Sequence, residues 1–169
     1  MGRQVRKTSD IQYIVLHHTA SNDKYSTHET LDDHLRATNL GYHVTIDDDL
    51  VFKAKAAGND GKFTFKQHVP DYEVVWGAAG CNFHGWHIAI DVNSQVNPPT
   101  DDEKFAVVQV IAAKAKLLGW RKADVRRIVS HQWVGQHIST PQYVTECPGK
   151  PLIEWLPVLR TRVAAYLPS

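Results

Sequence analysis

The sequence predicts a single α/β domain with a mixed central β-sheet flanked by helices. Three observations carry this prediction. Apolar runs typical of strands alternate with stretches of helical periodicity, two of these runs are adjacent and read as a hairpin, and no linker, repeat or low-complexity tract divides the 169 residues. The hairpin adds an antiparallel pair to strands that are otherwise joined through helices and one long loop, which makes the sheet mixed.

The expected strands are short apolar runs that end at polar or glycine-rich stretches. They are residues 11–16, the two halves of residues 42–54 around an acidic turn at 47–49, residues 86–92 and residues 126–131. The run at 86–92 shows little alternation, which predicts a strand in the middle of the sheet. Residues 56–72 are rich in Gly, Asn, Asp and Lys and are expected to form a long surface loop.

Helices are expected after two capping boxes, in which a Ser or Thr hydroxyl accepts from a backbone N–H and a Glu three residues later reaches back. The boxes are "STHE" at residues 26–29 and "TDDE" at residues 100–103. The second box introduces helical spacing up to Gly119, a residue type favoured just past a helix end. A third helix is expected from Pro151 onward, and Pro157 should kink it or split it in two.

Charge and hydropathy exclude two classes of partner. With 19 basic and 18 acidic residues the formal charge is +1, which gives no general field that would attract nucleic acid. No window of 18 apolar residues is present, so membrane insertion is not expected. Residues 1–10 are basic and lack the apolar region of a secretory signal, so we expect synthesis in the cytoplasm. We interpret these ten residues as a frayed, solvated extension before a domain over residues 11–169.

Ten histidines are many for a chain of 169 residues, and clustered histidines usually act as metal ligands or in proton transfer. Three candidate zinc ligands lie at the ends of expected elements, where side-chain direction is well fixed. They are His17, His131 and Cys147. Taken alone, each histidine is more often a hydrogen-bonded filler, and a lone cysteine is usually a small buried hydrophobe.

Four segments follow one another in the order "IVLHHTA", "GYHVTIDDDLVFKA", "WHIAID" and "IVSH…TECPG". Together they resemble the zinc-dependent N-acetylmuramoyl-L-alanine amidases, a family that includes phage lysozymes of the amidase type, bacterial muropeptide amidases and animal peptidoglycan-recognition proteins. The resemblance covers residues 11–149. It implies one Zn²⁺ per chain, held by His17, His131 and Cys147 with water as the fourth ligand. His18 is expected to pack or hydrogen-bond beside this site.

The resemblance also implies three assisting residues. Tyr42, from "GYH", would hydrogen-bond the attacking water or the developing oxyanion, although by itself it would read as a tyrosine at the edge of the core. Thr145, two residues before the third ligand, would donate to the oxyanion. Asp91 stands where some members carry a glutamate as general base. Its shorter side chain suits either that role through a second water or the orientation of a histidine.

Two features depart from the family pattern. His131 and Cys147 are 16 positions apart, and the extra segment brings His137, which lies in sequence of loop type and is the less favoured ligand. The family's frequent Trp-His-Ala-Gly appears as "WGAAG", so Gly77 replaces a histidine that often lines the substrate groove. Cys81 is expected to be a buried, inert thiol. Five further histidines have no motif support and are expected to pack or lie at the surface: His28, His34, His68, His84 and His87.

The resemblance implies hydrolysis of the amide bond between N-acetylmuramic acid and L-alanine in bacterial peptidoglycan, and we expect a monomer. A single catalytic domain without a signal favours a phage-type endolysin that is released at lysis. The alternatives are a cytosolic muropeptide-recycling amidase, a non-catalytic peptidoglycan-binding protein on the same fold, and a globular domain without metal. Cys147 argues against the binding protein, because such relatives typically lose the cysteine ligand.

Overall fold

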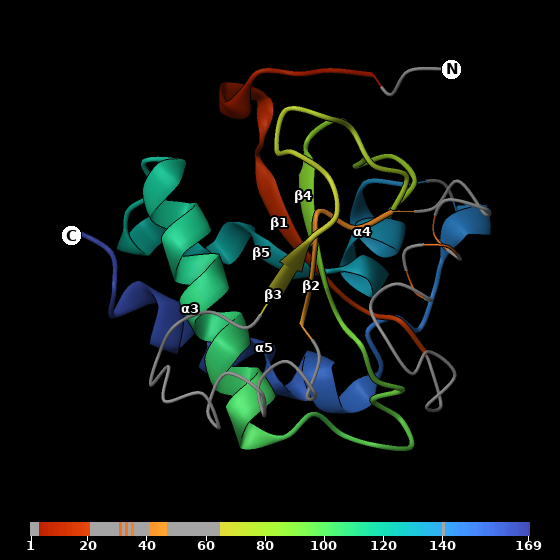
Figure 1. Ribbon diagram of the computed structural model, residues 1–169. Coiled ribbons are helices and arrows are strands. Elements are labelled where there is room, and N and C mark those ends of the chain that lie inside the picture. The colour runs from red at the N-terminus through yellow and green to blue at the C-terminus, as the bar shows by residue number, and fades with distance from the viewer. Residues whose placement is uncertain are drawn as a thin grey trace.

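A mixed β-sheet lies between two helical layers in the computed structural model (Figure 1). The structure describes residues 4–20, 31, 33, 35, 41–46, 65–139 and 141–169. The strands are β1 (Tyr13–His18), β2 (Val44–Ile46), β3 (Phe65–Gln67), β4 (Gly85–Ile90) and β5 (Ile128–Ser130). Their order across the sheet is β3-β2-β4-β1-β5; the β2–β3 pair is antiparallel and the other pairs are parallel. The α/β prediction with a mixed central sheet is confirmed.

The helices cover the two faces of the sheet unequally (Figure 1). They are α3 (Asp101–Leu117), α4 (His131–His137) and α5 (Lys150–Ala164), with short 3-10 helices η1 (Thr8–Asp10), η2 (Lys122–Arg127) and η3 (Pro141–Tyr143). The larger core lies under α3 and α5 and takes alternate strand side chains such as Ile14, Leu16 and Ile88. A smaller cluster on the opposite face joins Val15 of β1 to Val134 of α4. This second face therefore carries the smaller apolar core.

Strand β4 is the central strand that its lack of alternation predicted. All six of its residues are buried, and it pairs with β2 on one side and β1 on the other. Trp86, Ile88 and Ile90 enter the larger core. Because strand side chains alternate between faces, His87 and Ala89 point to the face that carries α4.

The second capping box and the helix that it introduces are confirmed. The Thr100 hydroxyl accepts from the Glu103 N–H at 3.2 Å, and a Glu103 carboxylate oxygen accepts from the Thr100 N–H at 2.6 Å. After α3 the chain turns at Gly119, whose φ of 69° lies in the left-handed region that favours glycine. α5 continues through Pro157 instead of splitting there, because Leu152, Leu156, Leu159 and Val163 bury one face along its whole length.

The prediction of a surface loop over residues 56–72 is wrong in part, because β3 lies within this range and extends the sheet beside β2. Leu31 and Leu35, which follow the first capping box, are helical and buried, as expected for the helix after that box. The capping box at 26–29, the acidic turn at 47–49 and the strand expected after it lie outside the described residues.

The interpretation of the first ten residues as a frayed, solvated end is wrong for Arg6. Its side chain is buried, and its guanidinium donates to the backbone carbonyls of Phe83 and Gly85, both at 2.7 Å. Val5 also forms a β-bridge with Glu73. Carbonyl acceptors supply the hydrogen bonds that a buried guanidinium needs, which the sequence pattern did not reveal. The division of the chain at residue 10 stays a prediction.

Among the described residues, no helix combines the length and the apolar character needed to cross a bilayer.

Candidate metal centre and active site

The pairing of β1 with β5 brings two of the candidate ligands together. Leu16 lies opposite Ser130 in this parallel pair, so the next residues, His17 and His131, come side by side at the same edge of the sheet. Their ring centroids are 4.7 Å apart. His131 is the first residue of α4 and not the last of the strand, because Ser130 caps the helix by accepting from the Trp133 N–H at 3.1 Å.

Hydrogen bonds from α4 and from the loop after β4 hold the segment that carries Cys147. The backbone N–H of Gln132, one of the unpaired donors in the first turn of α4, donates to the Cys147 carbonyl at 2.7 Å. On the other side, the Ser94 hydroxyl donates to the Pro148 carbonyl. Gly149 follows with a φ of 85°, and a Cβ there would lie 2.5 Å from the Ser94 hydroxyl oxygen, so only glycine fits this close approach.

The ligand atoms of His17, His131 and Cys147 lie within 4.8 Å of one another. The Cys147 Sγ is 3.7 Å from His17 Nδ1. Zinc bonds of about 2.1 Å to nitrogen and about 2.3 Å to sulfur, at a tetrahedral angle, would separate these two atoms by about 3.6 Å. The three side chains therefore fit a zinc ion with one coordination position left for substrate or water. Their role as ligands stays a prediction.

Burial sets the protonation of the three groups. Desolvation, and after it the neighbouring His131, lowers the pKa of His17 well below its usual 6.5, and desolvation lowers that of His131 to about 4. Both imidazoles are thus neutral at neutral pH, which is the form that binds a metal. Burial raises the pKa of the Cys147 thiol to about 12, so a bound cation would have to displace its proton.

His17 has a second buried partner that the sequence analysis assigned only to packing or the surface. Its Nε2 lies 3.0 Å from Nδ1 of His87. The His87 backbone N–H in turn donates to Nδ1 of His43 at 3.0 Å, and the rings of His87 and His43 stack. One signal in the sequence was available. His87 lies four positions before the candidate residue Asp91, so the two side chains are expected on the same face of their strand.

The assisting residues lie beside the cluster in different ways. The ring of Tyr42 packs against that of His17, with centroids 5.1 Å apart. The Thr145 hydroxyl accepts from the Cys147 N–H at 3.2 Å, which places it next to the third candidate ligand. Asp91 follows β4 on the same face, and its carboxylate accepts from the Thr19 hydroxyl at 2.5 Å. The catalytic roles of these three residues stay predictions.

Three further expectations have clear outcomes. His18 is hydrogen-bonded beside the site, as expected, with Nδ1 3.1 Å from the Ser94 hydroxyl. His137 is exposed and stacks on Trp133, and it ends α4 instead of lying in a loop. Cys81 is a free thiol buried in the smaller core, where burial raises its pKa to about 12.

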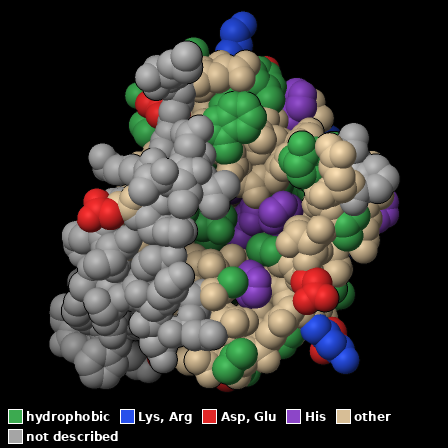
Figure 2. All heavy atoms as spheres, turned by 90° about the vertical axis from the view of Figure 1, so that its right-hand side faces the viewer, with side chains coloured by type: hydrophobic (Ala, Val, Ile, Leu, Met, Phe, Trp, Pro, Cys, Tyr) green, Lys and Arg blue, Asp and Glu red, His purple; other side chains and the backbone are tan. Residues whose placement is uncertain are grey.

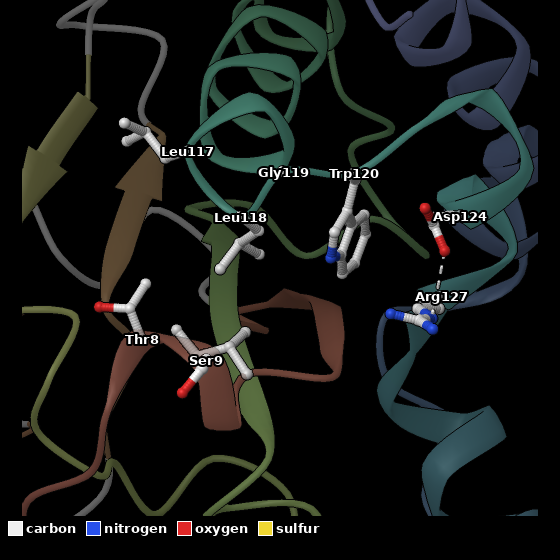
Figure 3. Close-up of a pocket in the computed structure, with 9 residues that line it drawn as sticks. Thr8, Ser9, Leu117, Leu118, Gly119, Trp120, Asp124 and Arg127 are labelled. Carbon is white, nitrogen blue, oxygen red and sulfur yellow. Dashed lines mark ion pairs between the residues drawn. The ribbon is translucent and has the colours of Figure 1, made fainter. Parts of the chain in front are cut away.

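The face that carries α4 shows histidine side chains gathered at its middle (Figure 2). Away from the three candidate ligands, a pocket of about 540 Å³ lies near the end of α3. Trp120, Leu118 and the Asp124–Arg127 ion pair line it (Figure 3). It contains none of the three candidate ligands.

Solved structures share this fold. The N-acetylmuramoyl-L-alanine amidase LysC from Clostridium intestinale URNW matches with a TM-score of 0.63 at 18% identity, over 94% of this chain and 91% of that one. The Ph2119 endolysin from Thermus scotoductus MAT2119 bacteriophage Ph2119 matches with a TM-score of 0.62 at 20% identity, over 95% and 89%. The Staphylococcus aureus hydrolase AmiA, solved with its ligand, matches with a TM-score of 0.65 at 14% identity, over 98% and 78%.

The fold is therefore that of amidases and endolysins, and the three-residue cluster gives it a site able to hold a metal. A search of curated proteins finds no match. The family model for N-acetylmuramoyl-L-alanine amidase matches residues 7–150. The chain belongs to the N-acetylmuramoyl-L-alanine amidase family, and its enzyme class is amidase, as the sequence motifs indicated.

Acidification is expected to destabilise the protein through His43, which is fully buried and whose pKa burial lowers to about 3. Below about pH 6.5 the unfolded chain takes up a proton at this residue and the folded chain does not, so the free energy of unfolding falls as the pH decreases. In urea unfolding, His43→Asn should make this dependence shallower by up to about 1.4 kcal/mol per pH unit between about pH 6 and about pH 4. Equal slopes for the variant and the natural protein would contradict this.

Proposed function

We propose that the chain is a zinc-dependent amidase that hydrolyses the bond between N-acetylmuramic acid and L-alanine in peptidoglycan. The observation that carries the proposal is the meeting of His17, His131 and Cys147 at one sheet edge in a chain of the amidase family. Thiolate and neutral imidazole are preferred zinc ligands, and the spacing of the sulfur and the nitrogen suits a tetrahedral site. Bacterial peptidoglycan is accordingly the proposed partner.

Amide hydrolysis needs an activated water, a proton acceptor and stabilisation of the developing oxyanion. Zinc at the three ligands would supply Lewis-acid activation of the water and of the scissile carbonyl. Tyr42, held against His17, would place its phenol near the reacting atoms and donate to the oxyanion. The Thr145 hydroxyl accepts from the Cys147 N–H and would use its own proton to stabilise the same oxygen.

Asp91 is the proposed proton acceptor. It lies on the metal-facing side of the sheet, two residues beyond Ala89, which is opposite His17 in the β1–β4 pair. The Thr19 hydroxyl donates to one of its carboxylate oxygens, and this bond fixes the orientation of the side chain. An aspartate is one methylene shorter than a glutamate, so we propose that it takes the proton through an intervening water.

Replacing Cys147 by Ser should remove both the metal and the activity. We expect the variant to bind Zn²⁺ at least about 100-fold more weakly and to lose turnover, because a serine hydroxyl does not give up its proton to a cation as readily as a thiol does. Zinc content, and the release of new L-alanine amino termini from purified cell walls, measure the two effects. Cys81→Ser is the matched control and should retain both, since Cys81 lies in the smaller core. Hydrolysis retained by Cys147→Ser would overturn the proposal. If the natural protein binds zinc but does not hydrolyse cell walls, the chain is instead a peptidoglycan-binding protein.

We propose the endolysin role in preference to muropeptide recycling. It is supported by likeness to structures described as endolysins, including one from a bacteriophage. An endolysin acts on the polymer, whereas a recycling amidase acts on soluble fragments. The natural protein should therefore release L-alanine amino termini faster from intact purified walls than from soluble muropeptides at equal bond concentration. The opposite preference would assign the chain to recycling while leaving the chemistry of the site unchanged.

A further inference from the structure

We propose that His87 is a positioning residue that holds the imidazole of His17 in the orientation needed to bind the metal. This inference rests on the proposed zinc site. Nδ1 of His17 is the nitrogen nearer the Cys147 Sγ, at 3.7 Å, so Nδ1 is the atom that would bind the metal. Nε2 must then carry the proton of the neutral ring, and it lies 3.0 Å from Nδ1 of His87. His17 therefore donates to His87.

The bond between the two rings is buried and geometrically fixed. His17 is 1% exposed and His87 is 0% exposed, so no bulk water competes for the bond. Both side chains come from paired strands, in which His17 lies opposite Ala89 and His87 lies two positions before Ala89. The backbone N–H of His87 is also bound, at 3.0 Å, to Nδ1 of His43. A ring on rigid strands is a suitable partner for orienting a ligand.

Two glycines create the space in which the His87 ring lies. A Cβ built on Gly77 would be 2.7 Å from Nδ1 of His87, and a Cβ built on Gly85 would be 2.6 Å from Nε2. Gly77 is also the position at which "WGAAG" departs from the family's frequent Trp-His-Ala-Gly. The chain thus lacks a histidine at position 77 and carries the imidazole of His87, from the neighbouring strand, in the adjoining space.

The unpaired nitrogen of His87 argues against a role in packing alone. Its Nε2 is buried and has no hydrogen-bond partner in the part of the chain that the structure describes. A buried polar atom without a partner disfavours folding, and an apolar side chain of similar size would avoid that penalty. A histidine at this position is explained if its other nitrogen, Nδ1, accepts the hydrogen bond that orients His17.

Two nearly isosteric substitutions separate hydrogen bonding from packing. In His87→Asn the amide oxygen can take the place of Nδ1 and accept from His17, whereas His87→Leu has the same shape and no acceptor. Loss of a partner that orients a metal ligand typically lowers metal affinity by about 10- to 100-fold. We therefore expect His87→Leu to bind Zn²⁺ at least about 10-fold more weakly than His87→Asn in competition with a chromophoric chelator. Circular dichroism of the metal-free variants shows whether both are folded.

The outcomes distinguish this inference from the proposed function. Absence of zinc binding by the natural protein would overturn the proposed zinc site, whereas zinc binding by the natural protein with equal affinities for the two variants would overturn the role of His87 alone. If a variant does not fold, long-range ¹H–¹⁵N spectra of the natural zinc-loaded protein give the imidazole tautomers directly. Protons on Nε2 of both His17 and His87 would support the inference. A proton on Nδ1 of His87 would overturn it.

Discussion

The site depends on one constraint, the in-register parallel pairing of β1 with β5. Because Leu16 lies opposite Ser130, the residues that follow, His17 and His131, leave the sheet at the same edge and on the same side. A shift of one residue in either strand would exchange the faces of its side chains and separate the imidazoles. The apolar residues on the other face, including Ile14 and Ile128, oppose such a shift because it would remove them from the larger core.

The third candidate ligand, Cys147, comes from a segment without regular structure, so hydrogen bonds take the place of strand pairing. The first turn of α4 contributes a backbone donor to Cys147, while Ser94 binds Pro148 and is itself next to His18. The two adjacent histidines of β1 therefore have different tasks on opposite faces of one strand. His17 points to the proposed metal, and His18 supports the segment that delivers the cysteine.

Local patterns predicted much of the fold and of the candidate site. Element ends and the residue types preferred by zinc made His17, His131 and Cys147 candidates, and the resemblance to the amidase family joined them into one ligand set. The structure brings these three residues together. The proposed role of His87 could not be predicted in the same way, because it depends on β4 lying beside β1 and on the absence of a side chain at Gly77. Arg6 was missed for a related reason, since its carbonyl partners lie 65 to 79 positions away in sequence.

X-ray absorption spectroscopy of the zinc-loaded protein tests the central claim most directly, because it reports the atoms around the metal. The account predicts one sulfur at about 2.3 Å and two imidazole nitrogens at about 2.0–2.1 Å, with a lighter fourth ligand. Loss of the sulfur signal in Cys147→Ser would assign that ligand to its residue. A zinc environment without sulfur in the natural protein would contradict the account.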